Sequence, residues 1–146
     1  MKNRGHKIKF RGGKDANKML MRKLATNFLL KGKMETTKQK AKAAQSIVEK
    51  LVTKAKTNSE ADRNFMLKHV TIQSMVKILV SQIAPSLTKV SSGYTRIVSM
   101  GQRGTDGAQI ARLEWVYPVV LETEKKIVEK KQSPKKEVIE KEANKS

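Results

Sequence analysis

Residues 36–56, TTKQKAKAAQSIVEKLVTKAK, determine the fold class because small and aliphatic side chains recur in them at helical spacing. The apolar positions are Ala41, Ala44, Val48, Leu51, Val52 and Ala55. Their period of 3.6 residues predicts an amphipathic helix that ends near Lys56 and buries one face. Thr36, followed three residues later by Gln39, fits a capping box that would begin this helix.

The segment before this helix predicts another one. Leu20, Leu24 and Phe28 recur every four residues, which is the spacing of one helix face. Asp15 is expected to cap this first helix, which runs to about Leu30. Gly32 is expected to end it, because glycine tolerates a left-handed backbone.

The segment after the central helix predicts two more. Ser59 with Asp62 is typical of a helix start, and this third helix is expected to end near Val70. A fourth helix is expected from about Gln73 to Ile83. Pro85 should terminate it, because the residue before a proline is disfavoured in helical conformation.

After the fourth helix the hydrophobic pattern changes to alternation. Residues 94–100 and 110–117 are strand candidates, and the Gly-rich segment 101–107 joins them as a hairpin with a flexible tip. Residues 33–36 are a candidate third strand. We therefore predict an α+β fold of about four helices packed on a small sheet with a β-hairpin.

The two ends of the chain differ from its middle in composition. Residues 1–14, MKNRGHKIKFRGGK, contain no acidic side chain and predict an extended basic arm. Residues 118–146 are rich in Lys and Glu with few apolar anchors, which predicts a mostly disordered tail. The expected organisation is thus a basic arm, one globular domain over 15–117, and a tail.

The charge of the chain points to a polyanionic partner. Its 146 residues carry a net charge of +19, with a pI near 10.3. Most of this excess lies in residues 1–56. Such a charge favours nucleic acid first and an anionic membrane surface second. No apolar run is long enough for a membrane span, and the basic start lacks the apolar segment of a secretory signal.

Signs of catalysis or of a bound cofactor are absent from the sequence. The chain has no cysteine, which excludes disulfides and thiolate metal sites. The GxxGxxG pattern over 101–107 joins strand to strand and matches no nucleotide-binding loop. The histidines, His6 and His69, lie far apart, and Asp62, Asp106 and Glu114 fall on different elements. We expect no enzyme, no metal, no cofactor and no small-molecule substrate.

Candidate RNA-binding residues gather in three places. In the arm, six cations are spaced for phosphate contacts: Lys2, Arg4, Lys7, Lys9, Arg11 and Lys14. At the start of the central helix, free backbone N–H groups and the helix dipole favour an anion beside four residues: Thr36, Thr37, Lys38 and Lys42. In the hairpin, we favour binding roles for Arg96 and Arg103 and a structural role for Tyr94.

The same residues also have plainer interpretations. For the arm, the plainer alternative is a basic tail surrounded by solvent, or a patch that binds polyanions without selectivity, and of the two we favour an arm that RNA orders. The central-helix start is equally an ordinary capped helix with solvent-exposed lysines. At 4% aromatic residues, base stacking in the manner of single-strand binders has little support.

Two longer stretches resemble a known family. Residues 34–56, METTKQKAKAAQSIVEKLVTKAK, and residues 91–116, SSGYTRIVSMGQRGTDGAQIARLEWV, are similar to the bacterial large-subunit ribosomal protein family numbered seventeen. The match runs from about Met19 to Val116 in the same order and spacing. The arm is shorter and less His-rich than in well-known members, and residues 118–146 extend past the usual family end.

The resemblance implies a structural role on the large ribosomal subunit in the cytoplasm. It implies binding to large-subunit rRNA near the peptide exit region, beside neighbouring ribosomal proteins and without a membrane. It also implies that the arm, His6 included, penetrates rRNA. On the first helix it implies that Lys18 and Arg22 face RNA, as do the residues of the 36–38 turn.

Three rival functions explain part of the same sequence. A nucleoid-type DNA-binding protein would account equally well for the charge. An RNA-modifying or RNA-cleaving enzyme would need one of the dispersed acids to be catalytic. A peripheral membrane binder would need an exposed apolar helix face, whereas the apolar stripes here are needed for the core.

Overall fold

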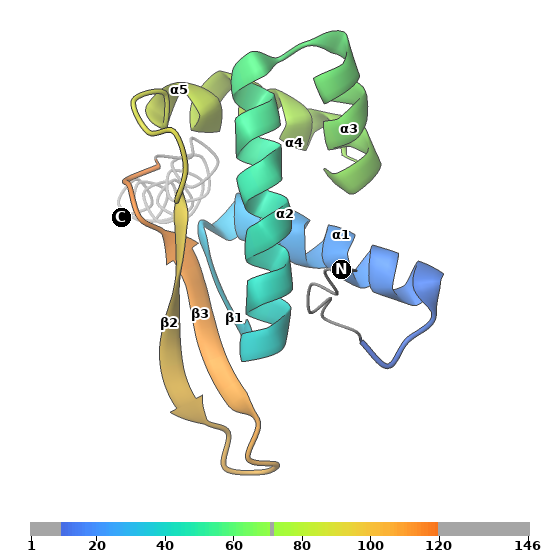
Figure 1. Ribbon diagram of the computed structural model, residues 1–146, viewed down its shortest axis with the longest axis vertical. Coiled ribbons are helices and arrows are strands. Elements are labelled where there is room, and N and C mark those ends of the chain that lie inside the picture. Colours follow the sequence, from blue (N-terminus) through green and yellow to red (C-terminus); the bar gives the residue numbers. More distant parts are fainter. Residues whose placement is uncertain (1–9, 71, 120–146) are drawn as a thin grey trace, which may run out of the picture.

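The computed structural model describes residues 10–70 and 72–119, which form an α+β fold (Figure 1). Its elements in chain order are α1 (Lys14–Lys31), β1 (Lys33–Thr37), α2 (Lys38–Thr57), α3 (Glu60–Val70), α4 (Gln73–Ile78), the π-helical turn η1 (Leu79–Ile83), α5 (Ala84–Ser86), β2 (Thr95–Gln102) and β3 (Gln109–Trp115). The predicted fold class is confirmed, and residues 33–37 do form the third strand. Most of the expected arm, and the tail from residue 120, lie outside the described residues.

The sheet is antiparallel, with β3 between the two edge strands β1 and β2. The register places Met34 and Ile97 on either side of Leu113, on the face that packs against α2. The next row along the strands, Glu35–Arg112–Val98, therefore lies on the opposite, open face. This alternation places the charged residues of β3, Arg112 and Glu114, on one face and its buried residues, Ala111 and Leu113, on the other.

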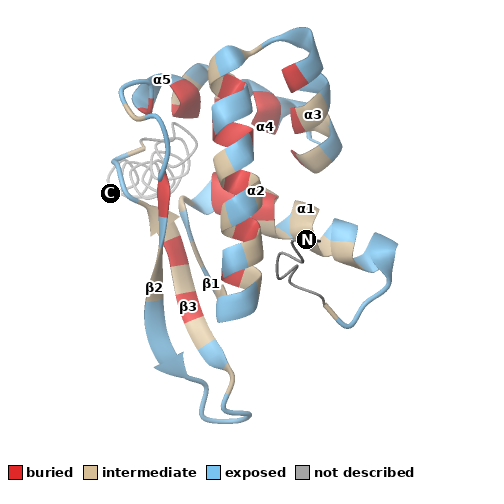
Figure 2. Cartoon of the chain, viewed as in Figure 1, coloured by how far each residue is buried: buried red, intermediate tan, exposed pale blue. Residues whose placement is uncertain are grey.

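Helix α2 is the centre of the core. All six positions of its apolar stripe are buried, as predicted, and α2 packs against all three strands and beside the other helices (Figure 1). Figure 2 shows buried residues along the length of α2, and further buried residues in the neighbouring helices and in β3. The partners that cover this stripe include Phe28 and Leu29 from α1 and Leu113 from β3. Burial of this stripe by both layers joins the helices and the sheet in one apolar core.

Of the two predicted ends of α1, the C-terminal one is confirmed and the N-terminal cap is wrong. Asp15 does not cap the helix; α1 begins at Lys14 after Gly13, and Asp15 lies in the first turn. There its carboxylate faces the positive end of the helix dipole, a favourable position without a capping bond. Gly32 ends the helix in the predicted left-handed conformation, with a φ of 69°. Its N–H donates to the Phe28 carbonyl.

The capping box expected at Thr36 is wrong. Thr36 belongs to β1, where it pairs with Ala111, and α2 begins only after Thr37. Pairing with β3 continues through Thr37, so α2 starts one residue later than predicted, and Thr37 rather than Thr36 occupies the position before the helix. The Thr37 side chain also makes no capping hydrogen bond. Non-local strand pairing therefore outweighed a local capping signal.

The Ser59–Asp62 box is confirmed. The Asp62 N–H donates to Ser59 Oγ at 3.3 Å, and the Ser59 N–H donates to Asp62 Oδ2 at 3.4 Å. Hydrogen bonds from the hydroxyls of Ser59 and Thr57, and contact with Lys54 at 2.9 Å, hold the pKa of Asp62 well below its usual range. This carboxylate joins the end of α2 to the start of α3.

Pro85 does not end the fourth helix where expected. Helical backbone continues through α5 to Ser86. The preceding turn is π-helical, with the Ala84 N–H donating to the Leu79 carbonyl. Such a widened turn changes which carbonyl faces each position, and so accommodates a proline ring that a regular α-turn would exclude.

The start of β2 is tied to α2 by polar contacts. Glu49 accepts hydrogen bonds from the backbone N–H groups of Tyr94 (3.2 Å) and Thr95 (2.9 Å) and from Thr95 Oγ1 (2.8 Å). The buried Tyr94 hydroxyl donates to the Ser91 carbonyl at 2.7 Å. It also accepts from Lys56 Nζ at 3.0 Å. Tyr94 therefore has the structural role predicted for it.

Candidate nucleic-acid interface

A groove opens where β1 becomes α2. Its lining residues are Thr37, Lys38, Gln39, Lys42, Ala108 and Gln109. The first turn of α2 contains no acidic side chain, so the positive end of the helix dipole is not neutralised by its own sequence. Lys38 and Lys42 are exposed on successive turns beside it. Backbone donors, dipole and two ammonium groups thus favour an anion at one place.

The hairpin completes this groove, which the sequence alone did not indicate. Thr37 pairs with Ile110, and this pairing brings Ala108 and Gln109 beside the start of α2. Gln109 adds an amide that can both donate and accept hydrogen bonds. Thr36, by contrast, pairs with the buried Ala111 and is not among the lining residues. Three of the four residues predicted at this turn therefore converge on the groove.

Helix α1 carries a second group of cations. Lys14 and Lys18 are exposed on the first turns, and this half of the helix extends away from the body of the fold (Figures 1 and 2). Arg11 is also exposed just before the helix. Arg22 is more constrained, because its Nε donates to the Lys68 carbonyl at 3.0 Å, at the end of α3. Lys2, Arg4, His6, Lys7 and Lys9 lie outside the described residues.

The two hairpin arginines are already paired within the chain. Arg96 lies on the open face of the sheet, where its Nε donates to Glu114 Oε1 at 2.7 Å. Arg103 pairs with Asp106 at the hairpin tip, which raises the pKa of Arg103 and lowers that of Asp106 to about 2. Both carboxylates reduce the local net charge. Neither arginine lines the groove at α2.

The hairpin tip itself is tighter than expected. The strands extend to Gln102 and Gln109, which leaves only residues 103–108 as the connection. The Arg103 N–H donates to the Ala108 carbonyl at 2.9 Å, and the Gly107 N–H donates back to the Arg103 carbonyl at 2.9 Å. These bonds close the turn from within.

The residues considered for catalysis do not meet. Asp62 caps α3, Asp106 pairs at the hairpin tip, and Glu114 pairs with Arg96 on the sheet. His69 Nδ1 lies 3.0 Å from the Phe65 carbonyl in its own helix. Across residues 10–70 and 72–119, no three potential metal-binding side chains come together. None of the helices in this part of the chain is long and apolar enough to cross a membrane.

Comparison with known proteins gives a consistent match. The sequence model of the ribosomal protein L17 family matches residues 20–116. The large ribosomal subunit protein bL17 of Clostridium acetobutylicum is 42% identical over 102 residues, which cover 70% of this chain and 90% of that protein. The bL17 proteins of Clostridium botulinum strain Hall and Clostridium perfringens strain SM101 are 42% and 41% identical over the same length.

Proposed function

The chain belongs to the ribosomal protein L17 family, and from this premise we propose that it binds the ribosomal RNA of the large subunit. Its relatives are named as large ribosomal subunit proteins, so its role is that of a structural component of that subunit. The proposed place is near the peptide exit region, beside neighbouring ribosomal proteins, in the bacterial cytoplasm. The proposed role involves no catalysis.

The groove at the start of α2 carries this proposal. An RNA phosphate there would meet the free N–H groups of the helix end and the ammonium groups of Lys38 and Lys42. Each cation that meets a phosphate releases condensed counterions, which supplies affinity without reading sequence. The amide of Gln109 adds a hydrogen-bonding group for a neighbouring ribose or phosphate. Thr37, the residue before the first turn of α2, lines the same groove.

The basic arm and α1 extend the proposed contact surface. Residues 1–14 carry charges of one sign, and RNA phosphates would remove their mutual repulsion. Lys14, which the structure places as the first residue of α1, and Lys18 carry this charge onto the exposed half of that helix. We assign supporting contacts to Arg22, Arg96 and Arg103, whose guanidinium groups keep donors beyond those used within the chain. The arm is the separate rRNA-binding unit, and 15–117 is the globular domain.

Binding to an rRNA fragment tests the groove directly. The variant Lys38→Ala/Lys42→Ala is compared with Lys77→Ala/Lys89→Ala, a control that removes the same charge from exposed positions away from the groove. In filter binding at several salt concentrations, the groove variant should lower the salt slope by about one for each phosphate that its removed lysines neutralise. An equal effect of both variants would mean that the groove is not the binding site.

Two further measurements separate the rival functions. Competition between structured large-subunit rRNA and duplex DNA at physiological salt should favour rRNA; a preference for DNA would support a nucleoid-type protein instead. Sucrose-gradient fractionation of a lysate should place the chain with the large subunit after a high-salt wash. Its release into the soluble fractions would contradict a structural role.

A further inference from the structure

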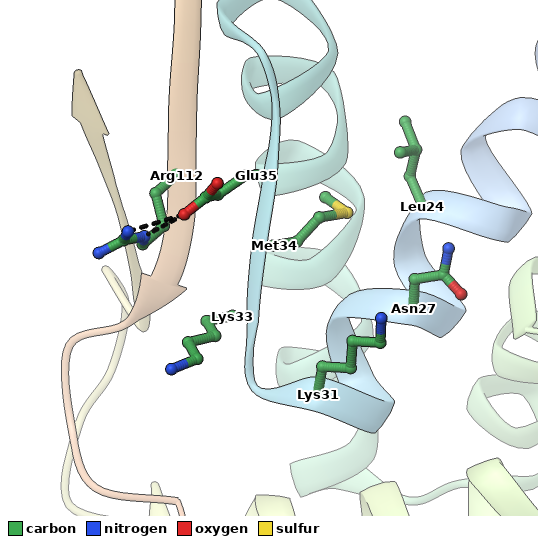
Figure 3. A pocket seen from close by; sticks show the side chains of 7 residues that line it. All are labelled: Leu24, Asn27, Lys31, Lys33, Met34, Glu35 and Arg112. Atoms are coloured by element: carbon green, nitrogen blue, oxygen red, sulfur yellow. Dashed lines mark hydrogen bonds and ion pairs between the residues drawn. The ribbon is translucent and has the colours of Figure 1, made fainter. Parts of the chain in front are cut away.

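A second groove lies between α1 and the free edge of β1 (Figure 3). Its lining residues are Leu24, Asn27, Lys31, Lys33, Met34, Glu35 and Arg112. They come from three elements, since α1 and β1 meet at Gly32 and β3 supplies Arg112 by pairing with β1. Its volume of about 650 Å³ is within the range of pockets that hold small ligands.

The cations of this groove outnumber its acid. Lys31, Lys33 and Arg112 contribute three positive charges, against one from Glu35. Glu35 also holds Arg112 in place, because Nε and Nη2 of the guanidinium donate to Glu35 Oε1 at 3.0 and 2.7 Å. The remaining N–H groups of Arg112 stay available for another acceptor. The groove therefore combines a net positive charge with one oriented guanidinium.

The groove is also lined by uncharged side chains, which come from α1 and β1. Leu24 and Met34 are half-buried and pack against the apolar core. Asn27 is exposed, and its amide makes no hydrogen bond to the described residues. Figure 3 shows Lys31 and Asn27 on the same side of the groove, with the Glu35–Arg112 pair across β1. An apolar surface, an amide and cations at one groove match the base and phosphate of a nucleotide.

We propose that this groove binds an unpaired segment of RNA. Phosphates would contact Lys31, Lys33 and Arg112, while an unstacked base would lie against Leu24 and Met34 with the Asn27 amide at its edge. A base that contacts Leu24 and Met34 has to leave its neighbours in the stack, so the segment that binds here is unpaired. The proposal rests on the RNA-binding function above and adds a second site with a preference for unpaired RNA.

NMR titration of the full chain with an oligouridylate tests this site. An oligonucleotide of about ten nucleotides is used, because this is a length typical of single-strand binding. The amide signals of residues 24–35 and the side-chain amide of Asn27 should shift. The variant Lys31→Ala/Lys33→Ala should bind this oligonucleotide roughly tenfold more weakly than the control Lys77→Ala/Lys89→Ala. Asn27→Asp, which places a carboxylate in the groove, should weaken binding without changing the unfolding temperature.

The possible outcomes separate this site from the groove at α2. Shifts confined to the surroundings of Lys38, Lys42 and Gln109 would overturn the second site and leave the proposed function in place. Absence of shifts with oligouridylate and with the rRNA fragment would overturn both. Inorganic polyphosphate that reproduced the Asn27 shift and the sensitivity to Asn27→Asp would overturn the nucleotide assignment, because polyphosphate has no base.

Discussion

The variant Glu49→Ala tests how α2 positions the hairpin. The Glu49 carboxylate accepts three hydrogen bonds at the start of β2, from the Tyr94 N–H, the Thr95 N–H and Thr95 Oγ1, at 3.2, 2.9 and 2.8 Å. Tyr94 and Thr95 are 1% and 4% exposed, so water cannot readily replace the missing acceptor. The variant therefore leaves buried donors without a partner at the point where the hairpin begins.

The size of the effect follows from these hydrogen bonds. An unsatisfied buried donor costs about 1–3 kcal/mol, and the three donors here share one carboxylate, so their costs are not additive. We expect Glu49→Ala to lower the free energy of unfolding by about 3 kcal/mol. Because domains of this kind are stable by about 5–15 kcal/mol, the loss is large but leaves the protein folded. Glu49→Gln keeps one acceptor oxygen and should lose about half as much.

Urea unfolding followed by circular dichroism measures this loss. Lys50→Ala is the matched control, because it removes an exposed charge from the next position of the same helix. It should change stability by less than about 0.5 kcal/mol. A double-mutant cycle of Glu49→Ala with Thr95→Val should show coupling between the two residues. A Glu49→Ala variant as stable as the control, or a cycle without coupling, would refute the reasoning.

Three further perturbations follow from the structure. The lowered pKa of Asp62 means that this carboxylate binds fewer protons in the folded than in the unfolded protein, so the stability that it contributes is present above about pH 4 and is lost as the pH falls. The urea midpoint should therefore decline in acid, and it should decline less steeply in Asp62→Asn. Gly32→Ala forces a left-handed φ of 69° on alanine and should cost about 1 kcal/mol in urea unfolding; a neutral effect would contradict the strain. The indole N–H of Trp115 has no hydrogen-bond partner among the described residues. The centroid of its ring lies 4.7 Å from the centroid of the Phe28 ring. Trp115→Phe should therefore cost under about 1 kcal/mol and Trp115→Ala about 2 kcal/mol, and equal losses would show that the ring packing matters less than argued.

Both candidate grooves depend on β1. One lies at its end, where Thr37 leads into α2, and the other lies along its free edge beside α1. Gly32 allows the chain to leave α1 and enter this strand directly, and pairing with β3 fixes its position. A substitution that weakens the pairing of β1 is therefore expected to affect RNA binding at both grooves together.

Local patterns in the sequence determined most of the helices. The apolar stripe of α2, the left-handed Gly32 and the Ser59–Asp62 box involve residues within a few positions of each other. Their physical causes are helical periodicity, backbone freedom and short-range hydrogen bonds, which a sequence displays directly. The concentration of positive charge in the first third, which predicts a polyanionic partner, is likewise a property of composition.

Tertiary structure alone decided the geometry of both grooves. Thr36 has the local signal of a helix cap, yet it is a strand residue because Ala111, far along the chain, pairs with it. The same pairing brings Gln109 into the groove that Lys42 lines, and Arg112 into hydrogen-bonding contact with Glu35. No local pattern encodes such neighbours, since the free energy that selects a strand register comes from pairing and burial across the whole sheet.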